Sequence, residues 1–160
     1  MCIRDRDIGV SNKEAKHYIE SYLAHYSGVD DYMKKMIDLA KDKGFSETLF
    51  HRKRYLPELA SSNHMMRAFG ERVARNMPIQ GTAADIIKIA MIKVDERMKA
   101  ENLRARLVLQ VHDELIVEAP QDESMRVALI VQEEMENAVK MSVPLTADAA
   151  IGRTWYDAKG

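Results

Sequence analysis

Cysteine is almost absent from this chain of 160 residues, which contains only Cys2. An internal disulfide is therefore impossible, and a single cysteine favours a reducing compartment over a secreted location. No apolar run approaches the roughly 20 residues that a membrane-spanning helix needs. The start of the chain also shows no signal-peptide pattern. We therefore expect a cytoplasmic protein that does not associate with membranes.

Several patterns of known chemistry are also missing. The chain has no Cys/His zinc pattern, no Gly-rich Walker-type loop and no Ser/His/Asp arrangement for nucleophilic catalysis. It has no internal repeat. Its apolar content of 46% is enough for a packed core of one domain, or of a large part of one. Residues 1–6, MCIRDR, match neither the periodicity nor the chemistry of the rest of the chain, so we interpret them as an artefactual leader.

The charge is unevenly distributed along the chain, although the net value is only −1. From residue 51 to residue 75 there are six Lys or Arg side chains against two acidic ones. From residue 113 to residue 136 there are eight acidic side chains against one basic one. This asymmetry predicts a phosphate-attracting surface upstream of a carboxylate-rich region that attracts metal ions. The alternative is two ordinary solvated faces.

Apolar periodicity predicts five helices, over residues 11–28, 29–43, 63–77, 80–102 and 122–140. The fourth has the clearest amphipathic pattern, with the expected buried residues Ala83, Ile86, Ile87, Ala90, Met91, Val94 and Met98. A short basic hairpin is expected over 45–56, and a final strand over 144–151. Helices and antiparallel strands occupy separate stretches, so the predicted class is α+β.

Residues 107–118, LVLQVHDELIVE, form the most informative stretch of the chain. Two apolar arms of strand type meet at a charged junction formed by His112, Asp113 and Glu114. Two-residue hairpins favour Asn-Gly or Asp-Gly because their turns need positive φ. No Gly or Asn occurs between residues 103 and 136. A junction that ignores local turn preference often marks a functional site.

Period-two alternation divides the first arm of this hairpin into two faces. One face is expected to carry Leu107, Leu109 and Val111, and the other Arg106, Val108 and Gln110. An exposed Asp beside a Glu at the tip suits Mg²⁺, which takes oxygen ligands and shares its shell with substrate phosphates. The alternative is a charged, solvated turn, since motif matches carry false positives.

Four blocks of sequence resemble one known family. They are ETLFHRKRYLPEL (residues 47–59), ERVARNMPIQGTAADIIK (71–88), QVHDELIVEAP (110–120) and GRTWYDAK (152–159). In this order and spacing they resemble the family A DNA polymerases of the bacterial DNA polymerase I type, over about residues 8–159. The tripeptide HDE alone is a weak signal, whereas the four blocks together are highly specific.

The resemblance implies that the hairpin is a catalytic element of the polymerase palm. Asp113 would be one of two aspartates that coordinate a pair of Mg²⁺ ions, and Glu114 an auxiliary catalytic carboxylate. Two cations about 3.5–4 Å apart stabilise the attacking and leaving oxygens of nucleotidyl transfer. The complete enzyme would be a monomer that copies primer-template DNA from deoxynucleoside triphosphates, in DNA replication or repair.

The resemblance also implies a set of DNA contacts. Residues near the primer and template would be Arg72, Asn76, Gln80 and His112. The basic residues Arg52, Lys53 and Arg54 are themselves expected to contact phosphates, which position a duplex without reading its sequence. On a helix, Arg72 and Asn76 would share one face while Val73 and Met77 pack inward. From the residues alone, each basic side chain could instead be a solvated charge, and His112 a turn residue.

The same resemblance divides the chain after the leader into two parts. Residues 7–62 would be fingers-side helices with the basic hairpin. Residues 63–160 would be palm helices, the catalytic hairpin and a C-terminal helix or strand. Together they would form one incomplete polymerase domain, with a partial palm sheet and helices of the fingers and palm. The first catalytic aspartate and the nucleotide-binding fingers helix of the family have no counterpart here, so we expect the isolated chain to be inactive.

Two other functions compete with this interpretation. A non-catalytic DNA-binding remnant of such a polymerase would keep the basic surface without the chemistry. A metal phosphohydrolase named for its His-Asp pair would gather further ligands from several helices, whereas His112 and Asp113 lie between expected strands. The remaining histidines show no ligand spacing: His17, His25, His51 and His64.

Overall fold

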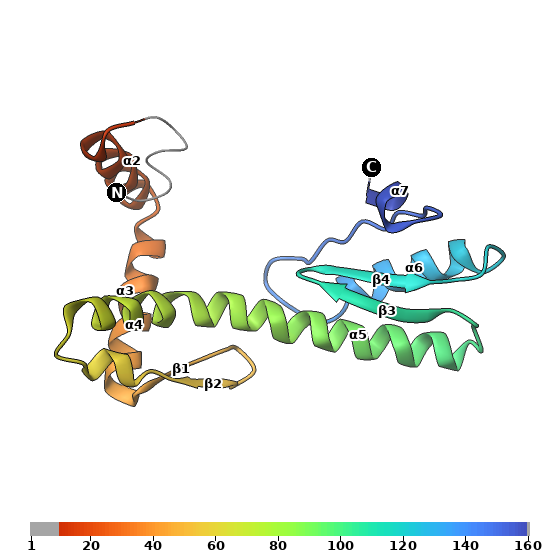
Figure 1. The fold of residues 1–160 in the computed structure, drawn as a ribbon, viewed down its shortest axis with the longest axis horizontal. Coiled ribbons are helices and arrows are strands. Elements are labelled where there is room, and N and C mark those ends of the chain that lie inside the picture. The colour runs from red at the N-terminus through yellow and green to blue at the C-terminus, as the bar shows by residue number, and fades with distance from the viewer. Residues whose placement is uncertain (1–9, 160) are drawn as a thin grey trace. The chain divides into compact units, whose positions relative to one another are not determined.

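The structure, a computed structural model, describes residues 10–159 (Figure 1). The expected leader over residues 1–6 lies outside this range. The chain forms two compact units, which divide between Pro78 and Ile79. Helices are combined with two small antiparallel sheets of two strands each, which confirms the α+β class. Within the described range, no helix has both the length and the apolar character needed to cross a membrane.

The first unit begins with two helices, α2 (Asn12–His25) and α3 (Ser27–Lys43). The Glu14 backbone N–H donates to Ser11 Oγ at 3.3 Å, and the Ser11 backbone N–H donates to Glu14 Oε2 at 2.9 Å. This reciprocal capping box confirms the expected helix start. Helix α3 starts two residues earlier than expected and ends at Gly44, whose φ of 74° lies in the left-handed region that glycine adopts without strain.

The basic hairpin is present but shorter than its expected arms. Strands β1 (Phe45–Glu47) and β2 (Lys53–Tyr55) pair in antiparallel register, with Phe45 opposite Tyr55. The loop between them folds back on Thr48, whose N–H donates to the Arg52 carbonyl at 3.0 Å. The Thr48 carbonyl also accepts from the His51 N–H at 3.0 Å, so the chain already reverses over residues 48–51 and the strands are shorter than expected.

The first unit packs around a small core. The 3₁₀ turn η1 (Pro57–Ala60) follows β2, and Asn63 then caps α4 (His64–Asn76) by accepting from the Met65 N–H at 2.8 Å. This cap confirms the predicted start of the helix. The buried side chains come from α3, η1, α4 and the end of the basic hairpin: Ala40, Leu56, Leu59 and Ala74.

A π-helical turn, η2 (Met77–Gly81), separates α4 from α5 (Thr82–Ala100). Pro78 lies in this turn and has no N–H to donate, which accounts for the interruption expected there. Helix α5 buries Ile87, Ala90, Val94 and Met98 as predicted. The expectation for Ala83 was wrong, because this residue is exposed. Ala83 lies in the first turn of α5, which borders an open groove, whereas α6 and β3 cover other parts of this helix.

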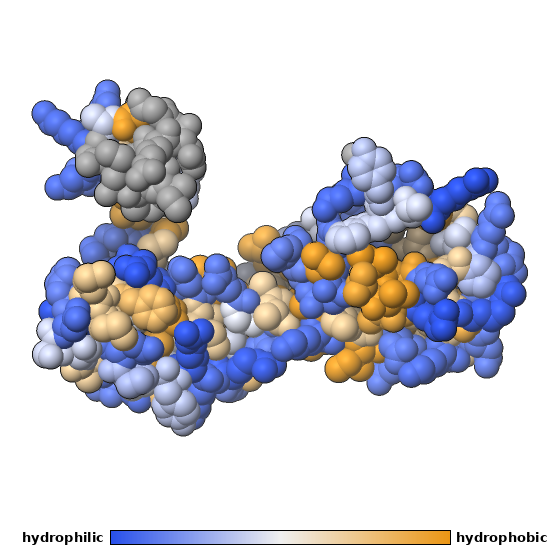
Figure 2. Space-filling view, viewed as in Figure 1, coloured by the Kyte–Doolittle hydropathy of each residue, from blue (hydrophilic) through white to orange (hydrophobic). Residues whose placement is uncertain are grey.

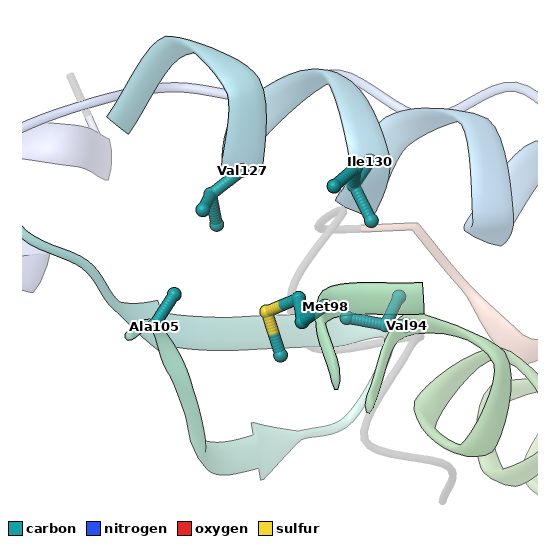
Figure 3. Close-up of a cluster of buried hydrophobic side chains, with 5 residues drawn as sticks. All are labelled: Val94, Met98, Ala105, Val127 and Ile130. Carbon is teal, nitrogen blue, oxygen red and sulfur yellow. The ribbon is translucent and has the colours of Figure 1, made fainter. Parts of the chain in front are cut away.

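The core of the second unit lies where α5, α6 (Ser124–Glu136) and the hairpin meet (Figure 3). Val127 and Ile130 of α6 face Val94 and Met98 of α5, and Ala105 closes one end of the cluster. Helix α6 is shorter at both ends than the predicted range of 122–140. Ala138, which lies beyond its end, is also buried.

The hairpin consists of β3 (Arg106–Val111) and β4 (Glu114–Glu118). Leu107 pairs with Val117 and Leu109 pairs with Ile116, so Val108 has no partner and forms a bulge. Directly paired residues share a face, and Leu107, Leu115 and Val117 pack on the core. Leu109 therefore lies on the opposite face from Leu107, and the alternation predicted for this arm was wrong. One extra residue in one strand reverses the facing of every residue after it.

The final strand expected over 144–151 is not formed, because no described strand pairs with this segment. A strand needs the backbone of a neighbouring strand as its hydrogen-bond partner. In this segment the Ala147 N–H donates instead to a side chain, at 3.2 Å from Glu136 Oε1. A short helix that the periodicity did not predict, α7 (Trp155–Lys159), comes after this segment. Figure 2 shows apolar surface over the β3–β4 hairpin, where Val108 and Leu109 are each about half exposed.

Candidate functional site

The tip of the β3–β4 hairpin is a two-residue loop, His112 and Asp113, between the paired residues Val111 and Glu114. His112 has a φ of 54°, in the left-handed region that costs a non-glycine residue free energy. The Gln110 side-chain amide donates to the His112 carbonyl at 2.5 Å and braces the turn. The hairpin therefore holds a histidine in a conformation that glycine or asparagine would adopt more easily.

This geometry presents two carboxylates in different surroundings. Asp113 is exposed, and no described residue makes a hydrogen bond or ion pair with it. Glu114 is half-buried, and its Oε1 lies 3.2 Å from the ammonium of Lys159. The other oxygen, Oε2, is buried without a hydrogen-bond partner among the described residues. Asp113 is thus available to a ligand, whereas Glu114 is already engaged by a cation of the same unit.

An open groove of about 2030 Å³ runs beside this turn within the second unit. Its walls come from α5, the β3–β4 hairpin, α6 and the segment from Leu145 to Lys159. Four predicted site residues line it: Gln80, His112, Asp113 and Glu114. The fold therefore brings together residues that are more than 30 positions apart in the sequence.

The other predicted site residues belong to the first unit. On α4, Arg72 and Asn76 are exposed, while Val73 is half-buried against the core and Ala74 is buried. This pattern confirms that Arg72 and Asn76 share the outer side of the helix. Arg72 also lies over the Phe69 ring, with its Cζ 5.8 Å from the ring centroid.

The basic hairpin exposes all three of its predicted phosphate-contacting side chains, Arg52, Lys53 and Arg54. The Lys53 ammonium lies 4.5 Å from the centroid of the Phe45 ring, a cation–π distance. The basic hairpin therefore exposes three cations, and one of them, Lys53, is oriented by an aromatic ring of β1.

The described side chains around Asp113 could supply only part of a binding site for a divalent metal ion. Among the described residues, no three His, Cys, Asp or Glu side chains converge to hold an ion. Mg²⁺ commonly takes only one or two carboxylates and completes its shell with water and substrate phosphates. The exposed Asp113 fits one such position, and the described residues do not make a complete metal site.

Lys159 was not among the predicted site residues. It lies on α7, and apolar periodicity cannot detect a helix of five residues with no buried side chain. The only available signal was the sequence block GRTWYDAK, which ends in this lysine.

Comparison with known proteins identifies the family. The sequence profile of DNA polymerase family A matches residues 5–157. This chain belongs to DNA polymerase family A. The chain is 53% identical over 154 residues to DNA polymerase I of Bacillus caldotenax and 52% identical to that of Geobacillus stearothermophilus. Each alignment covers 96% of this chain and 18% of the relative, so the chain spans about a fifth of the length of these polymerases.

A solved structure agrees with the sequence comparison. The POL domain of Pol1 from M. smegmatis, in complex with DNA primer-template and dNTP, matches with a TM-score of 0.92 and 44% identity. The match covers 98% of this chain and 28% of that one. The fold described here is therefore that of one portion of a family A polymerase domain.

Proposed function

We propose that this chain is the part of a DNA-directed DNA polymerase that supplies one metal-binding aspartate and part of the primer-template surface. The observation that carries the proposal is the β3–β4 turn, which exposes the unengaged carboxylate of Asp113 to an open groove that Gln80 and His112 also line. Belonging to family A makes template-directed nucleotidyl transfer the activity to test.

Asp113 is the metal ligand in this proposal, and Glu114 is an auxiliary carboxylate beside it. The metal is Mg²⁺, with two ions in the complete enzyme, which would stabilise the charge that develops on the reacting oxygens. The second catalytic aspartate and the cationic residues that receive the triphosphate would come from polymerase segments other than these 160 residues. The isolated chain is accordingly expected to be inactive.

The DNA contacts divide by the kind of group that each residue offers. Gln80 and His112 line the groove and could contact the primer and template next to the metal. Arg72 and Asn76 present a cation and an amide on the outer side of α4, a combination that suits the acceptors of the minor groove. Arg52, Lys53 and Arg54 suit phosphates, which position a duplex without reading its sequence.

The proposal includes a complete enzyme that is monomeric and lies in the cytoplasm, a location that fits the single cysteine. The proposal also assigns residues 7–62 to the fingers side of the polymerase domain and residues 63–160 to the palm.

The test is a chimera in which residues 10–160 replace the matching segment of the B. caldotenax DNA polymerase I. Primer extension with Mg²⁺ should be retained in the chimera and lost, by a factor of roughly a thousand, on Asp113→Asn, because the metal loses a charged ligand. Asp95→Asn on α5, a surface change outside the groove, is the matched control and should leave extension within about twofold. An Asp113→Asn chimera that extends primers at the parent rate would contradict the proposal.

The same chimera distinguishes the second function. A DNA-binding remnant would bind primer-template in a salt-dependent manner but would give no extension in the parent chimera. That result would favour a non-catalytic role for these 160 residues.

A further inference from the structure

The C-terminal helix α7 is joined to the hairpin turn by one ion pair. Lys159, the last residue of α7, places its Nζ 3.2 Å from Oε1 of Glu114. Glu114 directly follows Asp113 in the sequence and opens β4. A residue 45 positions away in the sequence therefore contacts the carboxylate next to the proposed metal ligand.

The segment before Lys159 is built to hold this position. The Thr154 N–H and its hydroxyl donate to Asp157 Oδ2 at 3.1 and 2.8 Å, and the Asp157 N–H donates back to Thr154 Oγ1 at 3.2 Å. This capping box fixes the start of α7, which is too short to be stable by itself. Lys159 then lies over the ring of Trp155, one helical turn earlier, with Nζ 5.4 Å from its centroid. The aromatic ring and the helix together limit where the ammonium can go.

Gly152 allows the chain to fold back against this helix. A Cβ added at Gly152 would lie 2.5 Å from the backbone nitrogen of Ala158 and 2.9 Å from Cβ of Asp157. No side chain fits at that distance from backbone atoms, so the close approach requires glycine. The path of the C-terminal segment toward Glu114 is therefore specified by glycine, by the capping box and by the aromatic ring.

Glu114 depends on this contact for its orientation. Its Oε2 is buried and has no hydrogen-bond partner among the described residues, and Lys159 supplies the one ion pair that Glu114 makes with any of them. A half-buried carboxylate that loses its counter-ion tends to turn toward water. This rotation of the Glu114 side chain would shift the first residue of β4, which follows directly after the strained His112 and Asp113.

We propose that Lys159 is a positioning residue that holds Glu114, and with it the turn that carries Asp113, through the capped helix α7. This inference rests on the proposed function, because the turn is argued to be part of a polymerase site. The contribution to stability is small, because the Lys159 ammonium is mostly exposed and an ion pair with one solvated partner contributes little. The effect falls instead on the geometry of the turn, where displacements of about 1 Å reduce rates.

The experiment uses the polymerase chimera in steady-state primer extension. Lys159→Met should lower kcat about three- to tenfold and leave the KM for the nucleotide within about twofold, because the nucleotide itself does not touch Lys159. Lys159→Arg should restore at least half of kcat, since the guanidinium can reach the same carboxylate. Lys99→Met is the matched control, because Lys99 also lies near a helix end and pairs with a carboxylate, that of Asp95 at 2.6 Å, on the same unit.

A double-mutant cycle separates positioning from general destabilisation. On a Glu114→Gln background, Lys159→Met should have no further effect on kcat, because its partner charge is already gone. An equal loss on both backgrounds, or an unchanged kcat for Lys159→Met, would overturn the inference.

A measurement without turnover keeps the inference separate from the proposed function. In ¹H–¹⁵N spectra of the 160-residue chain, Lys159→Met should shift the backbone amide signals of Asp113 and Glu114, and Lys99→Met should not. If these two signals do not move, the inference is wrong whatever the chimera does. If Asp113→Asn keeps full extension, the proposed function fails, and the spectra still decide whether Lys159 holds the turn.

Discussion

Replacing His112 by glycine should stabilise the second unit, because the native residue has a φ of 54°. A left-handed conformation costs an L-residue roughly 1–2 kcal/mol. Glycine removes that cost, but its greater freedom in the unfolded chain lowers the stability of the fold by about 0.5–1 kcal/mol. The His112 side chain is exposed, so little packing is lost. The net expectation for His112→Gly is a gain of about 0.5–1 kcal/mol in the free energy of unfolding.

Urea denaturation followed by the fluorescence of Trp155 measures this change, because Trp155 is the single tryptophan and belongs to the second unit. With a slope near 1 kcal/mol/M, the midpoint should rise by roughly 0.5–1 M. Asn102→Ala is the opposite control, since Asn102 has a φ of 55° and alanine tolerates that conformation less well. Its midpoint should fall. A midpoint for His112→Gly at or below that of the parent would refute the argument that the turn is strained.

Four further predictions concern packing, charge, association and DNA affinity. Ile130→Ala should lower the free energy of unfolding by about 2–5 kcal/mol in a urea titration, because Ile130 is fully buried. Leu129→Ala, at the neighbouring exposed position, should lower it by less than about 1 kcal/mol in the same assay. The Arg126 guanidinium lowers the pKa of the Glu101 carboxyl below its ordinary value. The pair therefore stabilises the fold at pH values above the ordinary pKa, and this contribution is lost as the pH falls through the lowered pKa. Thermal unfolding between pH 7 and pH 3 should accordingly be less pH-dependent for Glu101→Gln than for the parent. We expect the isolated chain to self-associate through the exposed apolar face of the hairpin, where Leu109 is about half exposed. Leu109→Lys should reduce this self-association in analytical ultracentrifugation, because it places a charge on that face, and equal sedimentation of the two proteins would count against that face as the contact. Arg54→Ala in the polymerase chimera should weaken primer-template binding and reduce the salt slope by about one, and an unchanged slope would remove Arg54 from the phosphate contacts.

Local sequence signals predicted most elements of the fold because they act within a few residues. The capping box of Ser11 and Glu14, the left-handed Gly44 and the Asn63 cap set helix ends where they were expected. Pro78 interrupts the helical path for the same kind of reason, since it lacks an N–H. The apolar periodicity of α5 identified Val94 and Met98, which are at the centre of the core of the second unit.

Tertiary structure decided the features that depend on distant partners. The bulge at Val108 reversed the facing of Leu109, because register is set by the pairing strand and not by the alternation of one arm. The segment over 144–151 has strand-like composition but no described strand to pair with, so it remains irregular.

The candidate site shows the same division between sequence and tertiary structure. The sequence alone determined that a His-Asp-Glu junction between two apolar arms forms a hairpin tip, and its blocks identified the polymerase family. Only the folded chain decided that Gln80 lines the same groove as Asp113, and that Lys159 pairs with Glu114. Residues this far apart in sequence meet because the buried core aligns α5, α6 and the hairpin, and because Gly152 lets the C-terminal segment fold back on α7.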